Sequence, residues 1–172
     1  MMSAESVVEI MDRLEGKGVA AWLDGGWGVD ALLGEQTRPH DDLDLVIALD
    51  RSREAQEALG PLGFQIVEDE IPTRFVMRDE SGRQVDFHTV VFDEENGGVQ
   101  HLQDGSSFRY PPEGFDCSGY VGGRSLRCLT PQVQVRCHCG YEPDETDYHD
   151  VLLLCTRFGI EPPQHYRGSM PR

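Results

Sequence analysis

Two hydrophobic periods alternate along the first half of the chain. The first is helical. Apolar residues recur three and four positions apart behind Ser3, which can cap a helix, and they are Val7, Ile10, Met11 and Leu14. This spacing predicts a helix that ends near Gly16. The unbroken apolar run over residues 19–23 comes next and predicts a buried strand.

The alternation continues to residue 91. Two further helices are predicted, at residues 27–33 and 52–62, and Gly34 ends the first of them. Four further strands are predicted, at residues 42–47, 64–67, 73–78 and 84–91. Because helices and strands follow each other in this way, we expect an α/β fold in which helices flank a sheet.

The chain changes character after Val91. Residues 93–119 are acidic, contain glycine and proline and lack a clear period, so we expect mainly loops there. The remaining segments predict a hairpin at 120–126 with a Gly-Gly turn, a helix from Thr130-Pro131 to about Cys139, a helix from about Glu145 to Gly159, and a frayed tail after Pro163. We therefore expect a core domain at 1–92 and a smaller, mostly helical segment at 93–172.

Paired carboxylates are the first candidate chemistry. Asp42 and Asp44 lie two apart in a predicted strand, so both side chains point to one face. Two adjacent carboxylates repel each other unless a cation lies between them, and oxygen ligands suit Mg²⁺. Asp86 and His88 share a face of another strand in the same way. Asp86 is a third candidate carboxylate or a solvated residue, and His88 either orients or deprotonates a substrate or merely packs.

A glycine turn precedes these aspartates. Asp24-Gly25-Gly26 leads into the helix predicted at 27–33, and such a turn exposes backbone N–H groups to an anion such as phosphate. A side chain at Gly26 would obstruct that approach. Trp27 could stack on a nucleotide, although packing in the core is the better expectation. Arg38 and His40 form part of the following loop and could contact phosphate oxygens or simply be exposed.

Composition and net charge limit the kinds of binding partner that we expect. The 172-residue chain carries a formal net charge of -16, which opposes binding to a nucleic-acid backbone and is compatible with a cationic small molecule or with solubility alone. The five cysteines predict free thiols in a reducing cytoplasm. No signal pattern is present at the N-terminus, and the longest apolar run, 151–155, is too short to cross a membrane. We expect a cytoplasmic protein that binds neither nucleic acid nor membrane.

One longer sequence motif resembles that of a known protein superfamily. The residues G-G-W-G-V-D-A-L-L-G followed by T-R-P-H-D-D-L-D resemble the nucleotidyltransferase superfamily, and within it the small antibiotic nucleotidyltransferases. Lincosamide enzymes are the most similar and aminoglycoside 2''-enzymes come next. The resemblance implies a mixed-sheet, α+β core and Mg²⁺-dependent transfer of AMP from ATP to an antibiotic hydroxyl, with release of pyrophosphate. It also implies Asp42, Asp44 and Asp86 as ligands of a site for two ions, with Asp86 as ligand or general base, and Gly25 and Gly26 beneath the triphosphate.

The segment from Gly140 to Asp150 also resembles the lincosamide enzymes. Its candidate contacts to the antibiotic are Tyr141, Glu145 and Asp147, together with His88, although an acidic first helical turn explains the acids equally well. Cys137-His138-Cys139 is not expected to bind zinc, because Cys-x-Cys on a helix directs its thiols apart. The alternatives that stay open are an aminoglycoside substrate, an antitoxin-like minimal nucleotidyltransferase acting on a partner protein, and association as a homodimer.

Overall fold

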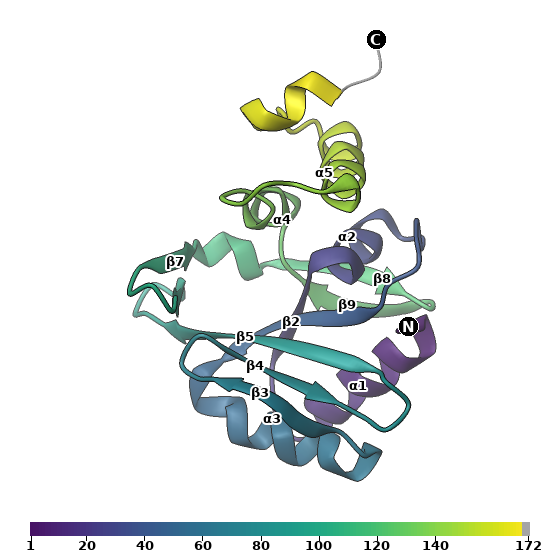
Figure 1. Ribbon diagram of the computed structural model, residues 1–172, viewed down its shortest axis with the longest axis vertical. Coiled ribbons are helices and arrows are strands. Elements are labelled where there is room, and N and C mark those ends of the chain that lie inside the picture. Colours follow the sequence, from purple (N-terminus) through teal and green to yellow (C-terminus); the bar gives the residue numbers. More distant parts are fainter. Residues whose placement is uncertain (170–172) are drawn as a thin grey trace.

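The computed structural model describes residues 1–169 as five α-helices, nine strands and short 3-10 turns (Figure 1). The helices are α1 (Ala4–Gly16), α2 (Gly25–Leu33), α3 (Ser52–Leu59), α4 (Pro131–Cys137) and α5 (Glu145–Phe158). The strands are β1 (Ala21–Asp24), β2 (Asp42–Ala48), β3 (Gln65–Glu70), β4 (Arg74–Arg78), β5 (Gln84–Phe92), β6 (Gly98–His101), β7 (Ser107–Tyr110), β8 (Cys117–Val121) and β9 (Arg124–Cys128).

A mixed sheet organises the molecule. Its strand order is β3-β4-β5-β2-β1-β9-β8, and the β6–β7 hairpin extends from the end of β5. The pairs β2–β5 and β1–β9 are parallel, and the other pairs are antiparallel. The predicted α+β class with a mixed sheet is confirmed.

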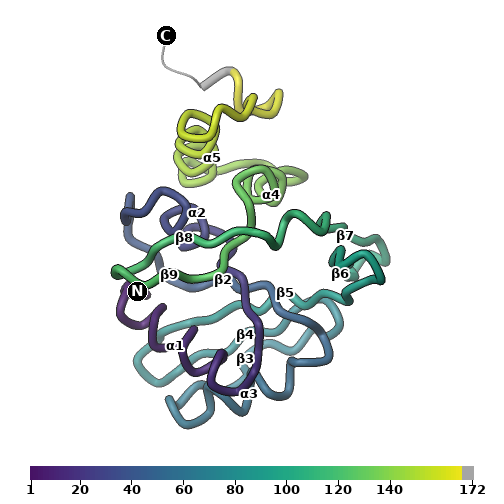
Figure 2. The backbone as a smooth tube through the Cα atoms, turned by 180° about the vertical axis from the view of Figure 1, so that it is seen from behind, coloured from purple at the N-terminus to yellow at the C-terminus, as the bar shows by residue number. Residues whose placement is uncertain are grey.

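One face of the sheet is covered by α1 and α3 (Figure 2). Ser3 caps α1 by accepting a hydrogen bond from the backbone N–H of Ser6, as its position in the sequence predicts. The apolar stripe of α1 belongs to the same core cluster as alternate residues of β2, which are Leu43, Leu45 and Ile47. Because strand side chains alternate between faces, the residues between these three point to the opposite face of the sheet.

A second apolar cluster joins α2, α4 and α5 at the opposite end of the molecule from α1 and α3 (Figure 1). Tyr166 belongs to it: the side chain is fully buried, and its hydroxyl donates to the carbonyl of His138 at 2.7 Å. The expectation of a frayed tail after Pro163 is therefore wrong for residues 164–169, which form a 3-10 helix anchored by this ring. The rest of the tail lies outside the described residues.

The second half of the chain departs from expectation in another region as well. Within residues 93–119, predicted as loops, β6 and β7 form a hairpin whose Tyr110 is buried in a third apolar cluster. Four-residue strands are too short to show a period. The hairpin with a Gly122-Gly123 turn is confirmed, and its strands β8 and β9 join the sheet beside β1. The division at residue 92 stays a prediction, and the sheet continues across it.

Candidate functional site

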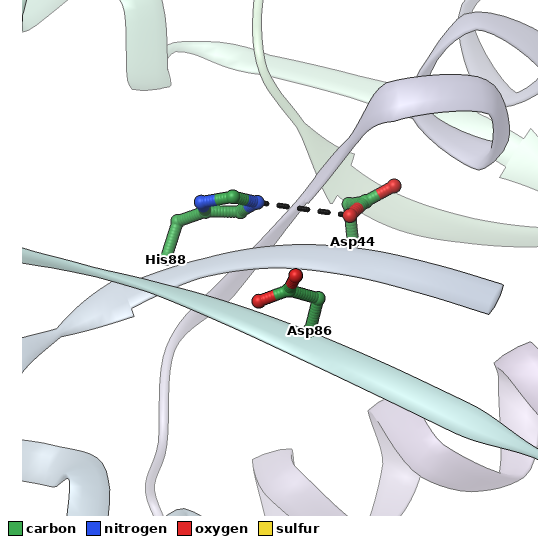
Figure 3. Close-up of side chains that lie close together, drawn as sticks. All are labelled: Asp44, Asp86 and His88. Carbon is green, nitrogen blue, oxygen red and sulfur yellow. Dashed lines mark ion pairs between the residues drawn. The ribbon is translucent and has the colours of Figure 1, made fainter. Parts of the chain in front are cut away.

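Three carboxylates form a row across neighbouring strands. Asp24 on β1 lies opposite Asp44 on β2, and Asp44 lies opposite Asp86 on β5. Their chain neighbours Leu23 and Leu45 are buried in the core beneath α1 and α3, so the aspartates point to the other face. Figure 3 shows Asp44 and His88 facing each other with Asp86 beside them.

The cluster is tight enough to hold a cation. One ligand atom from each of Asp44, Asp86 and His88 lies within 4.8 Å of the other two. His88 Nε2 is 3.6 Å from Asp44 Oδ1. Arg74 Nη1 donates to Asp86 Oδ2 at 2.5 Å, whereas Asp86 Oδ1 is buried and has no hydrogen-bond partner within residues 1–169. A buried carboxylate oxygen without a partner is costly, and a bound cation or a substrate proton would satisfy it.

The electrostatics of the cluster follow from burial and crowding. Burial raises the pKa of the Asp86 carboxyl, and the charge of Asp44 adds to that rise, while His88 and Arg74 oppose it. Burial and the same Asp44 charge raise the pKa of Asp24. Burial by itself would lower the pKa of His88, but the surrounding carboxylates outweigh this and raise it to about 9. The site therefore has an excess of negative charge and favours a positive occupant.

Asp42 is separate from this cluster. It lies on the same face of β2 as Asp44, as predicted, but two residues earlier, at the start of the strand, where its register partner is Gln84. Burial and the charges of Asp44 and Asp86 raise the pKa of Asp42, so this residue experiences the same negative electrostatic potential as the cluster. The structure therefore brings two of the three predicted metal ligands together, and Asp42 stays a predicted ligand at the border of the site.

The glycine pair lies in the first turn of α2 rather than in a turn before it. Asp24 caps the helix by accepting from the N–H of Gly25 at 2.8 Å. Gly25 has φ +56°, in the left-handed region, and a Cβ there would collide with the Asp44 carboxylate. The α2 N-terminus consequently lies directly against Asp44, so the element predicted to bind phosphate is beside the candidate cation site.

Gly26 is close to the two predicted loop residues. A Cβ at Gly26 would collide with the His40 ring and lie 2.6 Å from Arg38 Nη2. Both side chains also have partners within the protein. Arg38 forms a bidentate ion pair with Asp150, and the buried His40 contacts Asp30 at 2.5 Å through Nε2. Their assignment to nucleotide binding stays a prediction.

Trp27 is buried in the core, where its ring packs against His40 with 4.7 Å between centroids. The structure does not bring it to the carboxylate row. Packing was the better expectation for this residue from sequence, and the core position agrees with it.

A cavity of about 360 Å³ opens beside the carboxylates. Its floor is acidic and its walls come from the β6–β7 hairpin and the residues after α4; the lining comprises Asp24, Gly25, Asp44, His88, Gln100, Leu102, Phe108, Tyr110, Cys137, His138, Cys139 and Tyr141. Of the predicted antibiotic contacts, His88 and Tyr141 line the cavity. Asp147 accepts from the Tyr141 hydroxyl at 2.8 Å and Glu145 is exposed, so neither of these acids lies on the wall itself.

Sequence reasoning missed two groups of site residues. Asp24 joins the row because of the β1–β2 register, and its only sequence signal is an acid at the end of an apolar strand. Gln100 and Tyr110 come from the unpredicted hairpin and gave no signal. All five cysteines are free thiols, and Cys137 and Cys139 line the cavity without forming a metal cluster among the described residues.

A mixed sheet that presents carboxylates on neighbouring strands next to a glycine-rich helix N-terminus is the arrangement expected of a nucleotidyltransferase. The comparison with known proteins agrees. The family model described as aminoglycoside-2''-adenylyltransferase matches residues 6–154, and the chain belongs to this family. It is an enzyme of the antibiotic nucleotidyltransferase class.

Individual relatives fall into two groups. The chain is 30% identical over 145 residues to a lincosamide resistance protein of Staphylococcus haemolyticus, covering 84% of this chain and 89% of the relative. It is 28% identical over 168 residues to a 2''-aminoglycoside nucleotidyltransferase of Escherichia coli, covering 94% and 90%. Among solved structures, the lincomycin-bound lincosamide adenylyltransferase LnuA matches with a TM-score of 0.79 and 27% identity, covering 93% of this chain and 99% of that one. The aminoglycoside enzyme ANT(2'')-Ia shares the fold, with a TM-score of 0.75 at 20% identity.

None of the helices within residues 1–169 has the length and apolar character needed to cross a membrane.

Proposed function

We propose that this enzyme transfers AMP from ATP to a hydroxyl group of a lincosamide antibiotic, in a Mg²⁺-dependent reaction that releases pyrophosphate. The observation that carries the proposal is that Asp44, which is clustered with Asp86 and His88, lines a cavity with aromatic and apolar walls. Such a site combines the oxygen ligands of a phosphate-bound cation with a surface for a partly apolar acceptor.

The residues of the site fit a divalent cation. The candidate ligands nearest one another are the carboxylates of Asp44 and Asp86, and Asp86 Oδ1 is a buried oxygen that lacks a partner among the described residues. Hard cations such as Mg²⁺ prefer carboxylate oxygen and substrate phosphate. When bound, the ion would neutralise charge on the phosphates. Asp42 is the expected additional ligand of a site for two ions.

The chain's own residues hold the triphosphate in place and remove the proton of the acceptor hydroxyl. In the reaction the acceptor oxygen bonds to the α-phosphorus, the bond from that phosphorus to the β-phosphate oxygen breaks, and pyrophosphate leaves with the electron pair. Gly25 and Gly26 hold the triphosphate through the first turn of α2. Asp86 acts either as a ligand or as the general base: if it is the base, its Oδ1 takes the proton of the hydroxyl, because Arg74 already occupies Oδ2, and the ion is then held by Asp44 and Asp42.

The cavity favours a lincosamide over an aminoglycoside. A lincosamide combines a sugar and an amine with an apolar chain, whereas an aminoglycoside is polar throughout. Leu102, Phe108, Tyr110 and Tyr141 add apolar and aromatic surface to a cavity that also contains acidic residues, which suits the first type of molecule. The net charge of -16 supports the aminoglycoside alternative, because those substrates are polycations. A match over residues 6–154, well beyond the core, argues against the antitoxin-like alternative.

Pyrophosphate release with ATP and Mg²⁺, measured over a panel of lincosamides and aminoglycosides, tests the proposal. We expect turnover with lincosamides, loss of turnover on chelation of the metal, and a loss of about 10²-fold or more in Asp44→Asn. Asp41→Asn is the matched control, since it removes an exposed carboxylate three residues away. Absence of pyrophosphate release with every acceptor would refute the proposal, and turnover with aminoglycosides alone would favour the alternative. The free thiols and the need for ATP suit a cytoplasmic setting.

A further inference from the structure

A buried amide contacts the back of the His88 ring. Gln100, on β6, is 5% exposed and joins three elements. Its Nε2 donates to the carbonyl of Thr73 at 3.0 Å and lies 3.3 Å from His88 Nδ1, and its Oε1 accepts from the Tyr110 hydroxyl at 3.1 Å. The hairpin that carries Gln100 therefore contacts the His88 ring through this polar side chain.

The Thr73 carbonyl fixes the orientation of this amide. A carbonyl oxygen can only accept, so the Gln100 atom that faces it must be the NH₂ group. Reversing the amide would place two oxygens against each other. The second hydrogen of the same NH₂ group then faces His88 Nδ1, and Nδ1 is the natural acceptor for it. A neutral His88 with its lone pair on Nδ1 carries its hydrogen on Nε2.

Nε2 is the ring atom that faces the reacting region. It lies 3.6 Å from Asp44 Oδ1, and His88 lines the cavity. If the ring is instead an imidazolium, both ring nitrogens carry a hydrogen, so Nε2 again carries one. In both charge states the atom facing the cavity is a donor without a free lone pair.

We infer that His88 serves the transfer reaction as a hydrogen-bond donor to a substrate oxygen through Nε2–H, held in that orientation by Gln100, and that it is not the proton acceptor. The inference rests on the proposed function. The hydroxyl proton passes to a carboxylate, for which Asp86 is the candidate in the proposed function, and His88 gains or loses no proton. Gln100 does not contact the reacting atoms and is a positioning residue.

Replacing the ring by groups with and without a donor tests this role. In His88→Gln an amide N–H can occupy the place of Nε2–H, but an amide cannot accept the hydroxyl proton. His88→Leu provides neither function. Losing one such donor costs about 10²-fold in turnover, so we expect His88→Leu to fall by that factor and His88→Gln to stay within about tenfold of the wild type. His101→Gln, one residue from Gln100 and exposed on the hairpin, is the matched control.

The turnover number and the Michaelis constants together identify the substrate oxygen that accepts the hydrogen bond from His88. If His88 contacts the acceptor hydroxyl in the bound state, the Michaelis constant for the antibiotic rises in His88→Leu. If it contacts the phosphoryl group only as charge develops, turnover falls and the Michaelis constants stay unchanged. His88→Gln activity as low as that of His88→Leu, with nucleotide and antibiotic still bound by calorimetry, would show that His88 is the base and overturn the inference. Nearly normal turnover of His88→Leu would also overturn it.

The protonation of the two His88 ring nitrogens can also be measured directly, without an activity assay. Nitrogen-15 NMR of the imidazole distinguishes a protonated ring nitrogen from a bare one. We expect the His88 Nε2 to carry a hydrogen on both sides of neutral pH, and Gln100→Leu to lose the preference between tautomers while the fold persists. A bare Nε2 in the wild-type protein refutes the inference even if the enzyme is active. If the wild type releases no pyrophosphate with any acceptor, the proposed function fails, whereas the NMR result still decides the orientation of the ring.

Discussion

One ion pair joins the two halves of the sequence beside the glycine turn. Arg38 and Asp150 are 112 positions apart, and Arg38 Nε and Nη2 donate to the two Asp150 oxygens at 3.1 and 2.6 Å. The hydrogen bond to Asp150 raises the pKa of the Arg38 guanidinium. The Asp150 side chain is 1% exposed, whereas that of Arg38 is 24% exposed. This difference in exposure predicts that substituting Arg38 and substituting Asp150 lower the free energy of unfolding by different amounts.

The size of the asymmetry follows from burial. Arg38→Met leaves an unpaired carboxylate that is almost fully buried, which costs about 3–5 kcal/mol. Asp150→Asn leaves a guanidinium that still reaches water, and an amide oxygen can still accept from it, so the cost is about 1–2 kcal/mol. At about 2–4 °C per kcal/mol, the melting temperature falls by about 6–20 °C in the first variant and about 2–8 °C in the second. The double variant recovers stability relative to Arg38→Met, because no buried charge remains.

Thermal and urea unfolding of the three variants measure these costs. Arg53→Gln is the control: Arg53 pairs with Glu57 on the surface of α3 and is 87% exposed, so its loss costs less than about 1 kcal/mol. If Asp150→Asn is as destabilised as Arg38→Met, or if the two substitutions are additive, the reasoning from a buried unpaired charge is wrong. MgATP binding to Asp150→Asn shows in addition whether the orientation of Arg38 matters to the nucleotide.

The other predictions concern the carboxylate row. Gly25→Ala places a Cβ against the Asp44 carboxylate at φ +56°, so we expect transfer to fall by about 10²-fold or more. Gly63→Ala, with φ +86° and open space around it, should leave turnover unchanged and lower only the stability. Arg74→Gln releases one oxygen of Asp86 and lowers turnover more than it lowers MgATP affinity; the matched variant Arg78→Gln, on the same strand, leaves turnover unchanged, and equal losses in both variants would argue against a positioning role.

Strand periodicity predicted the local geometry of the carboxylates because it depends on backbone alone. Residues two apart in a strand share a face, so the common direction of Asp42 and Asp44, and that of Asp86 and His88, could be derived without a structure. The same rule does not say which strands are neighbours. Asp24 belongs to the row only because β1 pairs with β2 in a register that the sequence does not display.

The contacts that sequence reasoning missed are long-range. Asp150 was recognised within a resembling segment, but its partner Arg38 lies in the other half of the chain, and an acidic residue on a helix gives no sign of the element it will meet. Tyr166 lies beyond a Pro-Pro pair, which favoured a frayed tail, and its burial depends on a pocket formed by α4 and α5. Tertiary packing decided both positions, and local propensity carries no information about it.

The residues of the candidate site come from two different parts of the fold. The carboxylates lie on three hydrogen-bonded strands and the glycines on a helix capped by Asp24, so the groups proposed to bind phosphate and cation are held by regular backbone. The opposite wall comes from a short hairpin and from the residues that follow α4. Side chains on that wall can change in size and polarity without disturbing the register of the carboxylates. A family that keeps one transfer chemistry and accepts different antibiotics is therefore expected to vary in the hairpin and in the segment around Tyr141, while Gln100 must stay wherever His88 needs its fixed orientation.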